Sequence, residues 1–208
     1  MSIRFLGVIA AIAVSLIVSG CASNSLAKYQ GADAGFAVFS YARQKDAPYR
    51  SYAFRYRTRD HKQDGYSVWI TDGILFQKDP DVNYGSQSAF VDVIRLPPGD
   101  YEIYDFDVHQ GSYPAEVTYS AQKEFSIPFS VHAGETVYLG EFLAIATKGK
   151  NIFGITVDGP PYFVLSDQNA RDLGIAKGKQ PAINTVRVAV PNADTLGLVF
   201  VRSKPLPQ

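Results

Sequence analysis

The sequence predicts a mainly β fold, an antiparallel β-sandwich with one short C-terminal helix. From residue 35 onward, short runs rich in Val, Ile, Tyr and Phe recur about every ten residues and are separated by Gly, Pro, Asp and Asn. No helical pattern lies between these runs, which argues against strand–helix–strand units. The 208 residues are 46% hydrophobic and 19% charged, so the chain can bury one core and does not have the composition of a disordered chain.

Eight strands are expected in the body of the domain. They cover residues 35–42, 51–58, 66–71, 88–96, 100–108, 124–131, 135–147 and 152–157. In the second strand Tyr52, Phe54 and Tyr56 alternate with arginines, so the aromatic side chains are expected to face the core. The sixth strand alternates in the same way, and Pro128 indicates that it lies at a sheet edge.

A helix and two more strands are predicted near the C-terminus. Ser166 and the polar residues after it are typical of a capped helix start, and residues 170–176 are expected to form two helical turns that end before Gly178. The two strands are 186–190 and 196–202, joined by a turn at 191–194.

The first 20 residues are predicted to be an export signal that is cleaved from the mature protein. Arg4 precedes the apolar run 5–18. As a helix this run would span only about 21 Å, whereas the hydrocarbon of a bilayer is about 30 Å thick. A short apolar run after a basic start is typical of a secretory signal peptide.

The end of this signal resembles the bacterial lipobox. The motif consists of Val18, Ser19 and Gly20 before Cys21, which is the single cysteine of the chain. The resemblance implies cleavage before Cys21, a diacylglycerol thioether on its sulfur and an acyl chain such as palmitate on its freed amine. Two or three such chains anchor a protein to a membrane without spanning it. An ordinary secretory signal followed by an incidental cysteine is the alternative.

The residue after the cysteine bears on the membrane to which the protein is sorted. In lipoproteins of diderm bacteria an aspartate at this position favours the inner membrane, and here the residue is Ala22. The resemblance therefore implies the outer membrane, with the protein facing the periplasm.

The chain divides into four parts. They are the lipoprotein signal peptide 1–20, the acylated N-terminus and flexible tether 21–34, the β-sandwich 35–165, and the short helix with the terminal strands 166–208, which is expected to pack on the same domain. The tether is predicted because its residues are small and polar and have no strong apolar period.

Two stretches of the body resemble bacterial lipoproteins with a prealbumin-like or carboxypeptidase-regulatory-like β-sandwich. They read LPPGDYEI over 96–103 and FSVHAGETVYLG over 129–140. We expect turns with positive φ at Gly99 and Gly134, and the rings of Tyr101 and Tyr138 inside the sandwich. The resemblance implies a fold and no particular activity.

Motifs for catalysis and metal binding are mostly absent from the sequence. There is no G-x-S-x-G and no H-E-x-x-H, and the lipid takes up the cysteine. The run 174–179 has one residue too few for a phosphate-binding loop. Asp79, Asp81 and Asn83 alternate like calcium ligands, but Tyr84 stands where the turn needs glycine. We therefore predict no catalytic residue, no metal site and no cofactor besides the covalent lipid on the cysteine.

A basic segment is the first candidate surface site. Residues 43–62 contain seven basic and two acidic side chains. Arg55, Arg57 and Arg59, here called the arginine stripe, would contact anionic lipid, lipopolysaccharide or an acidic partner. The alternative is a solvated face that protects a sheet edge.

A pair of acids is the second candidate site. Asp105 and Asp107 are expected on one face of a strand together with His109, where they would serve acid–base chemistry or hold a small ligand. The alternative is again a solvated strand face.

These observations favour a lipid-anchored, non-catalytic binding or scaffolding protein of the cell envelope. The expected partners are the bilayer, through the acyl chains, and an envelope protein. Nucleic acid is not expected, because 20 basic and 20 acidic residues give a formal charge of zero. The alternative is a periplasmic small-ligand binder or enzyme whose site is assembled from scattered side chains.

Overall fold

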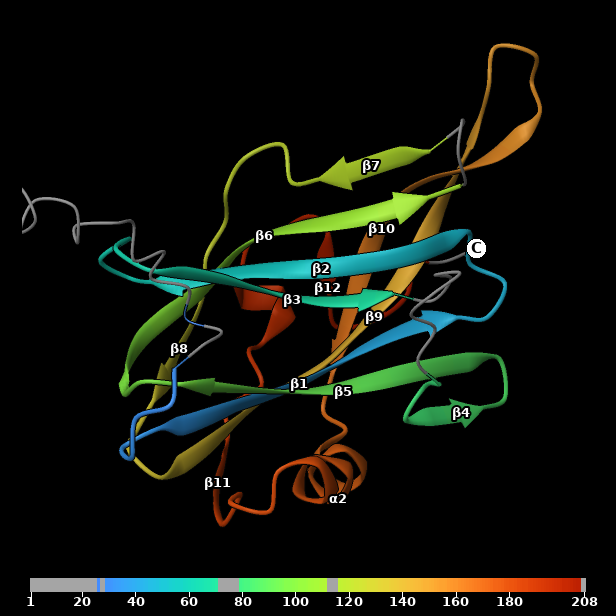
Figure 1. Cartoon of the computed structure of the whole chain (residues 1–208). Helices are drawn as coiled ribbons and strands as arrows, with labels where there is room; N and C mark the ends of the chain where they lie inside the picture. The colour runs from blue at the N-terminus through green and yellow to red at the C-terminus, as the bar shows by residue number, and fades with distance from the viewer. Residues whose placement is uncertain (1–25, 27–28, 71–78, 112–115, 207–208) are drawn as a thin grey trace, which may run out of the picture.

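The computed structural model describes Leu26 and residues 29–70, 79–111 and 116–206. Two β-sheets pack face to face, and one α-helix lies on the outer face of the larger sheet (Figure 1). The predicted β-sandwich with a C-terminal helix is confirmed. The signal 1–20, the lipobox and Cys21 lie outside the described residues.

The larger sheet has seven strands in the order β12-β10-β9-β1-β5-β4, and β11 also pairs with β9. Their bounds are β1 Gly35–Gln44, β4 Val82–Tyr84, β5 Gln87–Leu96, β9 Glu135–Lys150, β10 Thr156–Ser166, β11 Thr185–Val188 and β12 Val201–Arg202. β1 pairs antiparallel with β5 and parallel with β9, and β10–β12 and β9–β11 are also parallel. The beginnings of β1 and β9 therefore lie at the same end of the sheet.

The smaller sheet has five strands in the order β3-β2-β6-β7, and β8 also pairs with β6. Their bounds are β2 Tyr49–Thr58, β3 Asp64–Ile70, β6 Gly99–Gln110, β7 Val117–Ser120 and β8 Ile127–Val131. Among the described strands β8 pairs with β6 alone, which confirms the edge position that Pro128 indicated.

Aromatic side chains fill the space between the sheets. Tyr52, Phe54 and Tyr56 are buried, as their alternation predicted. The ring centroid of Phe54 lies 4.7 Å from that of Phe142 and 5.2 Å from that of Phe163, both on the opposite sheet. Large rings in such contacts bury much apolar area in few residues, which gives the domain a core without disulfides.

The strand predicted at 152–157 is wrong over most of its length. Residues 151–155 form the turn between β9 and β10, and the strand follows at Thr156–Ser166. Pro160 and Pro161 argued against a strand here, because proline has no N–H group to donate in the hydrogen bonds of a sheet. The register of β9 with β10 shifts between Asp158 and Pro161.

The C-terminal elements differ in length from the prediction. Helix α2 covers Asn169–Lys179 and continues through Gly174 and Gly178, so it does not end before Gly178. Its N-cap is Gln168, which makes no side-chain capping hydrogen bond. The strand predicted at 196–202 is reduced to β12, and a short 3₁₀ helix, η2 (Ala193–Thr195), occupies the predicted turn.

The edge strands β4 and β7 were not predicted. They have three and four residues and contain mostly polar or half-exposed side chains. Such short edge strands carry no clear alternation, because neither face is fully buried.

The described part of the predicted tether lies against the sandwich. Leu26 is 3% exposed and belongs to the main core. A guanidinium N–H of Arg95 donates to the carbonyl of Gly31 at 2.7 Å, and Ala34 is buried. Residues 29–34 are thus packed at the end of the sheet where β1 begins.

The stretches that resemble a known family contain one turn and one ring as expected. Gly134 has a φ of +68°, and Tyr101 is buried between the sheets with its hydroxyl donating to the Pro97 carbonyl. Gly99 has no positive φ and begins β6. Tyr138 is buried on the other face of the larger sheet, beneath α2, and not inside the sandwich.

Candidate functional site

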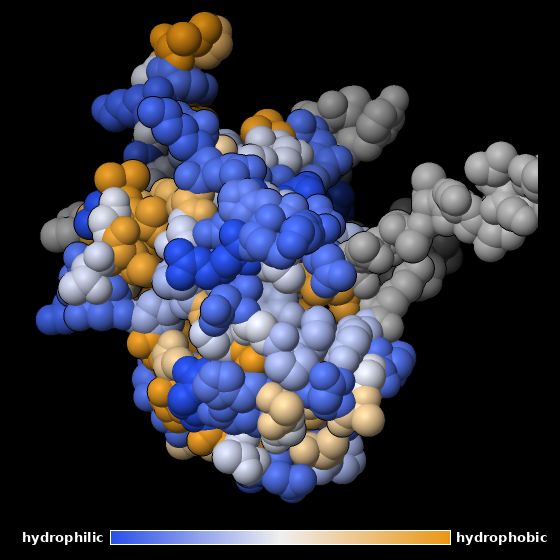
Figure 2. Space-filling view, turned by 90° about the vertical axis from the view of Figure 1, so that its left-hand side faces the viewer, coloured by the Kyte–Doolittle hydropathy of each residue, from blue (hydrophilic) through white to orange (hydrophobic). Residues whose placement is uncertain are grey.

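Three strongly exposed apolar side chains lie together at the tip of the β9–β10 hairpin. Ile152, Phe153 and Ile155 are 93%, 79% and 60% exposed. Figure 2 shows this hairpin as a projection with a hydrophobic end above hydrophilic residues. We call residues 151–155 the hairpin tip. Grouped apolar side chains on a projection are unusual on a soluble domain and mark an interaction site.

The hairpin projects because β9 is longer than its neighbour β1. The last registered pair between β1 and β9 is Arg43 with Ala144. Beyond that point, residues 145–150 have β10 as their strand neighbour. Six residues of β-strand extend roughly 20 Å, which takes the hairpin tip well beyond the body of the sandwich (Figure 1).

Four of the five backbone N–H groups of the hairpin tip donate within the turn itself. The side-chain oxygen of Asn151 accepts from the N–H groups of Phe153 and Ile155 at 2.9 and 3.0 Å. Gly154, whose φ is +74°, donates to the carbonyl of Asn151, and Asn151 donates to the carbonyl of Ile155. The turn is therefore fixed by its own hydrogen bonds, and its apolar side chains are left to face outward.

The base of the hairpin is fixed by three contacts. The Thr147 hydroxyl donates to the carbonyl of Pro160 at 2.8 Å, and the Tyr49 hydroxyl donates to the carbonyl of Gly159 at 3.2 Å. Lys148 forms an ion pair with Asp158 across the ribbon. The Tyr49 contact ties the ribbon to β2 of the other sheet, and the other two contacts join the two arms of the ribbon.

The charge along the hairpin is positive. Lys148 and Lys150 are the charged residues between Glu141 and Asp158 in the sequence. Lys150 is exposed and makes no ion pair with any residue that the structure describes. The apolar hairpin tip is thus bordered by a cation with no counter-charge.

The hairpin tip and the N-terminal segment lie at opposite ends of the larger sheet (Figure 1). Phe36, near the start of β1, pairs with Thr136, near the start of β9. β9 has 16 residues and is therefore roughly 50 Å long. Residues 29–34 are therefore separated from the hairpin tip by roughly the length of β9.

The arginine stripe is largely paired with acids of β6. Arg55 binds Asp107 through two hydrogen bonds of 2.8 and 2.6 Å. Arg57 binds Glu102 at 2.7 Å and Glu124 at 3.0 Å. The two arginines within β2 therefore have their positive charge offset within the sheet.

Arg59 differs from the other two arginines. It follows the end of β2, and its side chain is exposed and makes no ion pair among the residues described here. Of the three, Arg59 alone offers an uncompensated charge to a partner.

The ion pair between Arg57 and Glu102 shifts a carboxyl pKa. Burial raises the pKa of Glu102, but hydrogen bonds from Ser126 and Arg57 and the charge of Arg57 outweigh burial, so that the pKa is lowered. A lowered pKa means that the stabilisation is present at neutral pH and is lost as the pH falls through that value.

Charge reversal should separate these two kinds of arginine. We expect Arg57→Glu to lower the free energy of unfolding by about 1.5–3 kcal/mol, because it removes charged hydrogen bonds and adds a carboxylate beside Glu102. Arg59→Glu should change it by less than about 0.5 kcal/mol. Urea unfolding at neutral pH measures both, and equal losses would contradict the pairing. Arg59→Glu is therefore the cleaner variant for testing partner binding.

The acids predicted on one strand face are indeed on the outer face of β6, as is His109. Asp107 accepts from Arg55 and Ser120, and Asp105 accepts from the N–H groups of Phe106 and Ala121. The ring of His109 contacts Glu116 and Thr118, so the structure does not direct it toward the two acids. All three side chains make local contacts, and they do not converge on a cavity.

A buried polar network that the sequence did not predict lies beneath α2. Its members are Ser40, Tyr138, Glu141, Arg171 and Asp172, here called the α2 network. Asp172 accepts from Ser40 at 2.5 Å, from Tyr138 at 2.8 Å and from Arg171 at 2.7 Å. Arg171 also binds Glu141 at 2.5 Å. The network joins the helix to β1 and β9.

The electrostatics of the α2 network follow from burial. Burial raises the pKa of Glu141 more than Arg171 lowers it. Burial and the carboxylate of Asp172 also raise the pKa of Tyr138, so its hydroxyl stays protonated and donates. Perturbed groups of this kind occur both at functional sites and in structural ion-pair networks. The full set of internal partners here indicates a structural role, the docking of α2.

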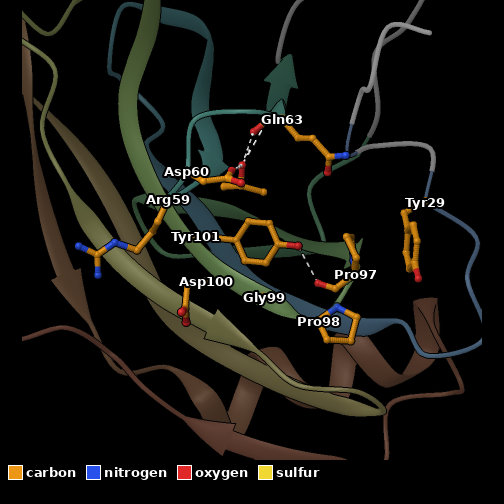
Figure 3. Close-up of a pocket in the computed structure, with 10 residues that line it drawn as sticks. Tyr29, Arg59, Asp60, Gln63, Pro97, Pro98, Gly99, Asp100 and Tyr101 are labelled. Atoms are coloured by element: carbon orange, nitrogen blue, oxygen red, sulfur yellow. Dashed lines mark hydrogen bonds between the residues drawn. The ribbon is translucent and has the colours of Figure 1, made fainter.

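A shallow pocket of about 570 Å³ lies at the end where β1 begins (Figure 3). It is bordered by Tyr29, Tyr101 and the loops around residues 58–63 and 97–100. Figure 3 shows the hydroxyl of Tyr101 directed at Pro97 and the Arg59 side chain directed away from Tyr29. The polar groups of the pocket do not converge on a common point.

In the part of the chain that the structure describes, no group of three or more His, Cys, Asp or Glu side chains is placed to hold a metal ion. No helix there is long and apolar enough to cross a membrane.

No protein-family model matches the chain, and neither curated proteins nor solved structures gave a match.

Sequence reasoning missed the hairpin tip, because its apolar residues looked like part of a strand. The signal was present in the charge pattern. Ile152, Phe153 and Ile155 stand in a stretch from 142 to 157 that has two lysines and no acid. Asn151 and Gly154 enclose the first two of them with turn-forming residues.

Proposed function

We propose that the protein is a lipid-anchored, non-catalytic binding protein of the cell envelope that presents the hairpin tip to a second envelope component. The observation that carries this proposal is the cluster of exposed Ile152, Phe153 and Ile155 at the end of a fixed projection. Holding three apolar side chains in water is unfavourable, by up to about 1.5–3 kcal/mol for each one relative to burial. A partner that covers them recovers that free energy.

The position of the anchor supports a binding role at the far end. In this proposal Cys21 carries the diacylglycerol and N-acyl chains, and Ala22 directs the protein to the outer membrane on its periplasmic side. Residues 29–34 lead into β1 at one end of the sheet, and the hairpin tip projects at the other (Figure 1). The hairpin tip then points away from the membrane that holds the lipid.

The proposal keeps the sandwich as a scaffold. The two sheets and the α2 network give a fixed body, and the prealbumin-like resemblance of 96–103 and 129–140 fits lipoproteins of this general architecture. The arginine stripe is a second, weaker binding surface in this proposal. Among the described residues its unpaired charge comes from Arg59, because Arg55 and Arg57 are paired with acids. An enzymatic or small-ligand role for Asp105 and Asp107 has less support, because each carboxylate is engaged locally.

Site-specific photocrosslinking in cells tests the proposal. A photoreactive phenylalanine analogue replaces Phe153 in one strain and Tyr66 in another. Tyr66 is the matched control, because it is an aromatic residue that is 65% exposed on β3, away from the hairpin. We expect light-dependent adducts with envelope lipid or protein from position 153, at roughly fivefold or greater excess over position 66. Equal yields at the two positions, or no adduct at 153, would exclude the hairpin tip as the binding element.

A further inference from the structure

We infer that the second component is the surface of an anionic bilayer, apposed to the membrane that holds the N-terminus, and that Ile152, Phe153 and Ile155 insert into its headgroup region. This inference rests on the proposed function and specifies the partner. It is argued from the shape, the hydrogen bonding and the charge of the hairpin.

The shape of the hairpin suits a soft, flat surface. The hairpin tip is convex and stands at the end of a ribbon that has left the body of the sandwich (Figure 2). A protein partner must offer a groove of matching depth to cover such a tip. A bilayer interface accommodates it without a preformed groove, because lipid headgroups part around apolar side chains.

The hydrogen bonding of the hairpin tip lowers the cost of leaving water. The backbone N–H groups of Asn151, Phe153, Gly154 and Ile155 all donate within the turn. An unsatisfied amide in an apolar medium is strongly unfavourable, so the internal bonding of four of the five donors lowers the free-energy cost of moving the tip into lipid.

The charge around the hairpin tip selects the kind of lipid. Lys150 directly precedes the tip and has no counter-charge among the described residues, while Lys148 shares its charge with Asp158. No acidic residue occurs from 142 to 157. A cation just behind an inserted apolar tip lies at headgroup depth, where anionic lipids attract it.

The position of the hairpin determines which bilayer it meets. The N-terminal segment and the hairpin tip are at opposite ends of a strand roughly 50 Å long. A body whose β1 end faces the anchoring membrane directs the hairpin tip away from that membrane. The structure therefore favours contact with a second surface, so that the protein would hold two lipid surfaces together.

A vesicle-capture assay tests this inference with the mature acylated protein. The protein is reconstituted through its own lipid into donor vesicles of phosphatidylcholine. Fluorescent acceptor vesicles contain either phosphatidylcholine alone or phosphatidylcholine with phosphatidylglycerol, and capture is measured by co-flotation. We expect capture of the anionic acceptors, and roughly tenfold less capture of the neutral ones.

Two variants show whether the hairpin tip is responsible. The tip variant is Ile152→Ser, Phe153→Ser and Ile155→Ser, and the matched control is Tyr66→Ser, Val68→Ser and Val199→Ser. All six side chains are exposed, so both variants keep the core intact. We expect the tip variant to lose roughly tenfold in capture and the control to lose none. Lys150→Glu should weaken capture of the anionic acceptors.

The outcomes separate this inference from the proposed function. Absent capture, or equal capture by the tip variant and the control, overturns the bilayer inference. If position 153 still crosslinks to an envelope protein in cells, the proposed function stands without it. If neither capture nor crosslinking occurs, both fail. The assay is repeated with acceptor vesicles that also carry the protein. If only these acceptors are captured, two copies of the protein pair through their hairpins, and the bilayer inference is overturned.

Discussion

Replacing Arg171 by methionine is expected to lower the free energy of unfolding by about 3–5 kcal/mol. Arg171 is the cation of the α2 network, and the variant leaves two carboxylates buried without it. Asp172 is fully buried and Glu141 is 2% exposed. Methionine replaces the apolar stem of the arginine, so most of the loss reports the missing charge and hydrogen bonds. Urea unfolding followed by circular dichroism measures it.

The same helix offers a control. Lys177 is exposed on α2 and makes no hydrogen bond or ion pair with the described residues. We expect Lys177→Met to change the free energy of unfolding by less than about 0.5 kcal/mol. A loss for Arg171→Met as small as that for Lys177→Met would mean that the α2 network contributes nothing to helix docking.

The pH dependence of the Arg171 variant has a definite sign. Burial raises the pKa of Glu141 even with Arg171 present. A carboxyl with a raised pKa stabilises the fold when it is protonated, and this contribution is lost as the pH rises through that pKa. Without Arg171 the pKa rises further. The defect of Arg171→Met should therefore be smaller at about pH 5 than at about pH 7.

Replacing Cys21 by serine is expected to abolish the incorporation of a clickable fatty acid into the protein. In the proposed function the thiol of Cys21 receives the diacylglycerol, and a serine hydroxyl is a much weaker nucleophile that cannot form the thioether. With no acyl chain the protein should be held much less strongly in the membrane fraction, because two or three acyl chains supply most of its membrane affinity in this proposal. In-gel fluorescence after cell labelling and fractionation measures both effects.

A control variant two residues after Cys21 shows whether a substitution near the cleavage site disturbs export in general. Ser23→Ala lies outside the lipobox and should be labelled like the wild type. Labelling that persists in Cys21→Ser, or an unmodified mature N-terminus found by mass spectrometry, would contradict the lipid anchor.

The strands that were predicted well are those with at least one buried face. β2 and β6 fall on the predicted ranges, because large side chains recur at alternate positions on their buried face. β1 and β9 are buried on both faces over most of their length, and their continuous apolar runs located them. β10 was misplaced because Pro160 and Pro161 interrupt that period at a register shift. Gly178 suggested an early end to α2, but packing of Ala176 against the sheet sustains the helix.

The candidate site was harder to predict, since it depends on what lies beside each residue in space. The excess of basic residues over 43–62 is real in the sequence, but it does not show which of them are paired. The acids Asp107 and Glu102, which pair with Arg55 and Arg57, lie about 50 residues further along the chain. The hairpin tip is a candidate binding site because β9 continues past its last pair with β1. No local sequence pattern reveals where that pairing stops. The α2 network joins three elements that are far apart in the sequence.

The parallel pairing of β1 with β9 has a consequence for biogenesis. β1 is the first strand to leave the ribosome, yet one of its two lateral partners lies about 100 residues later in the chain. The core cannot close until that late segment has been synthesised. In the proposed function the chain is exported, and a core that closes late would keep the precursor unfolded long enough to pass through a narrow translocation channel.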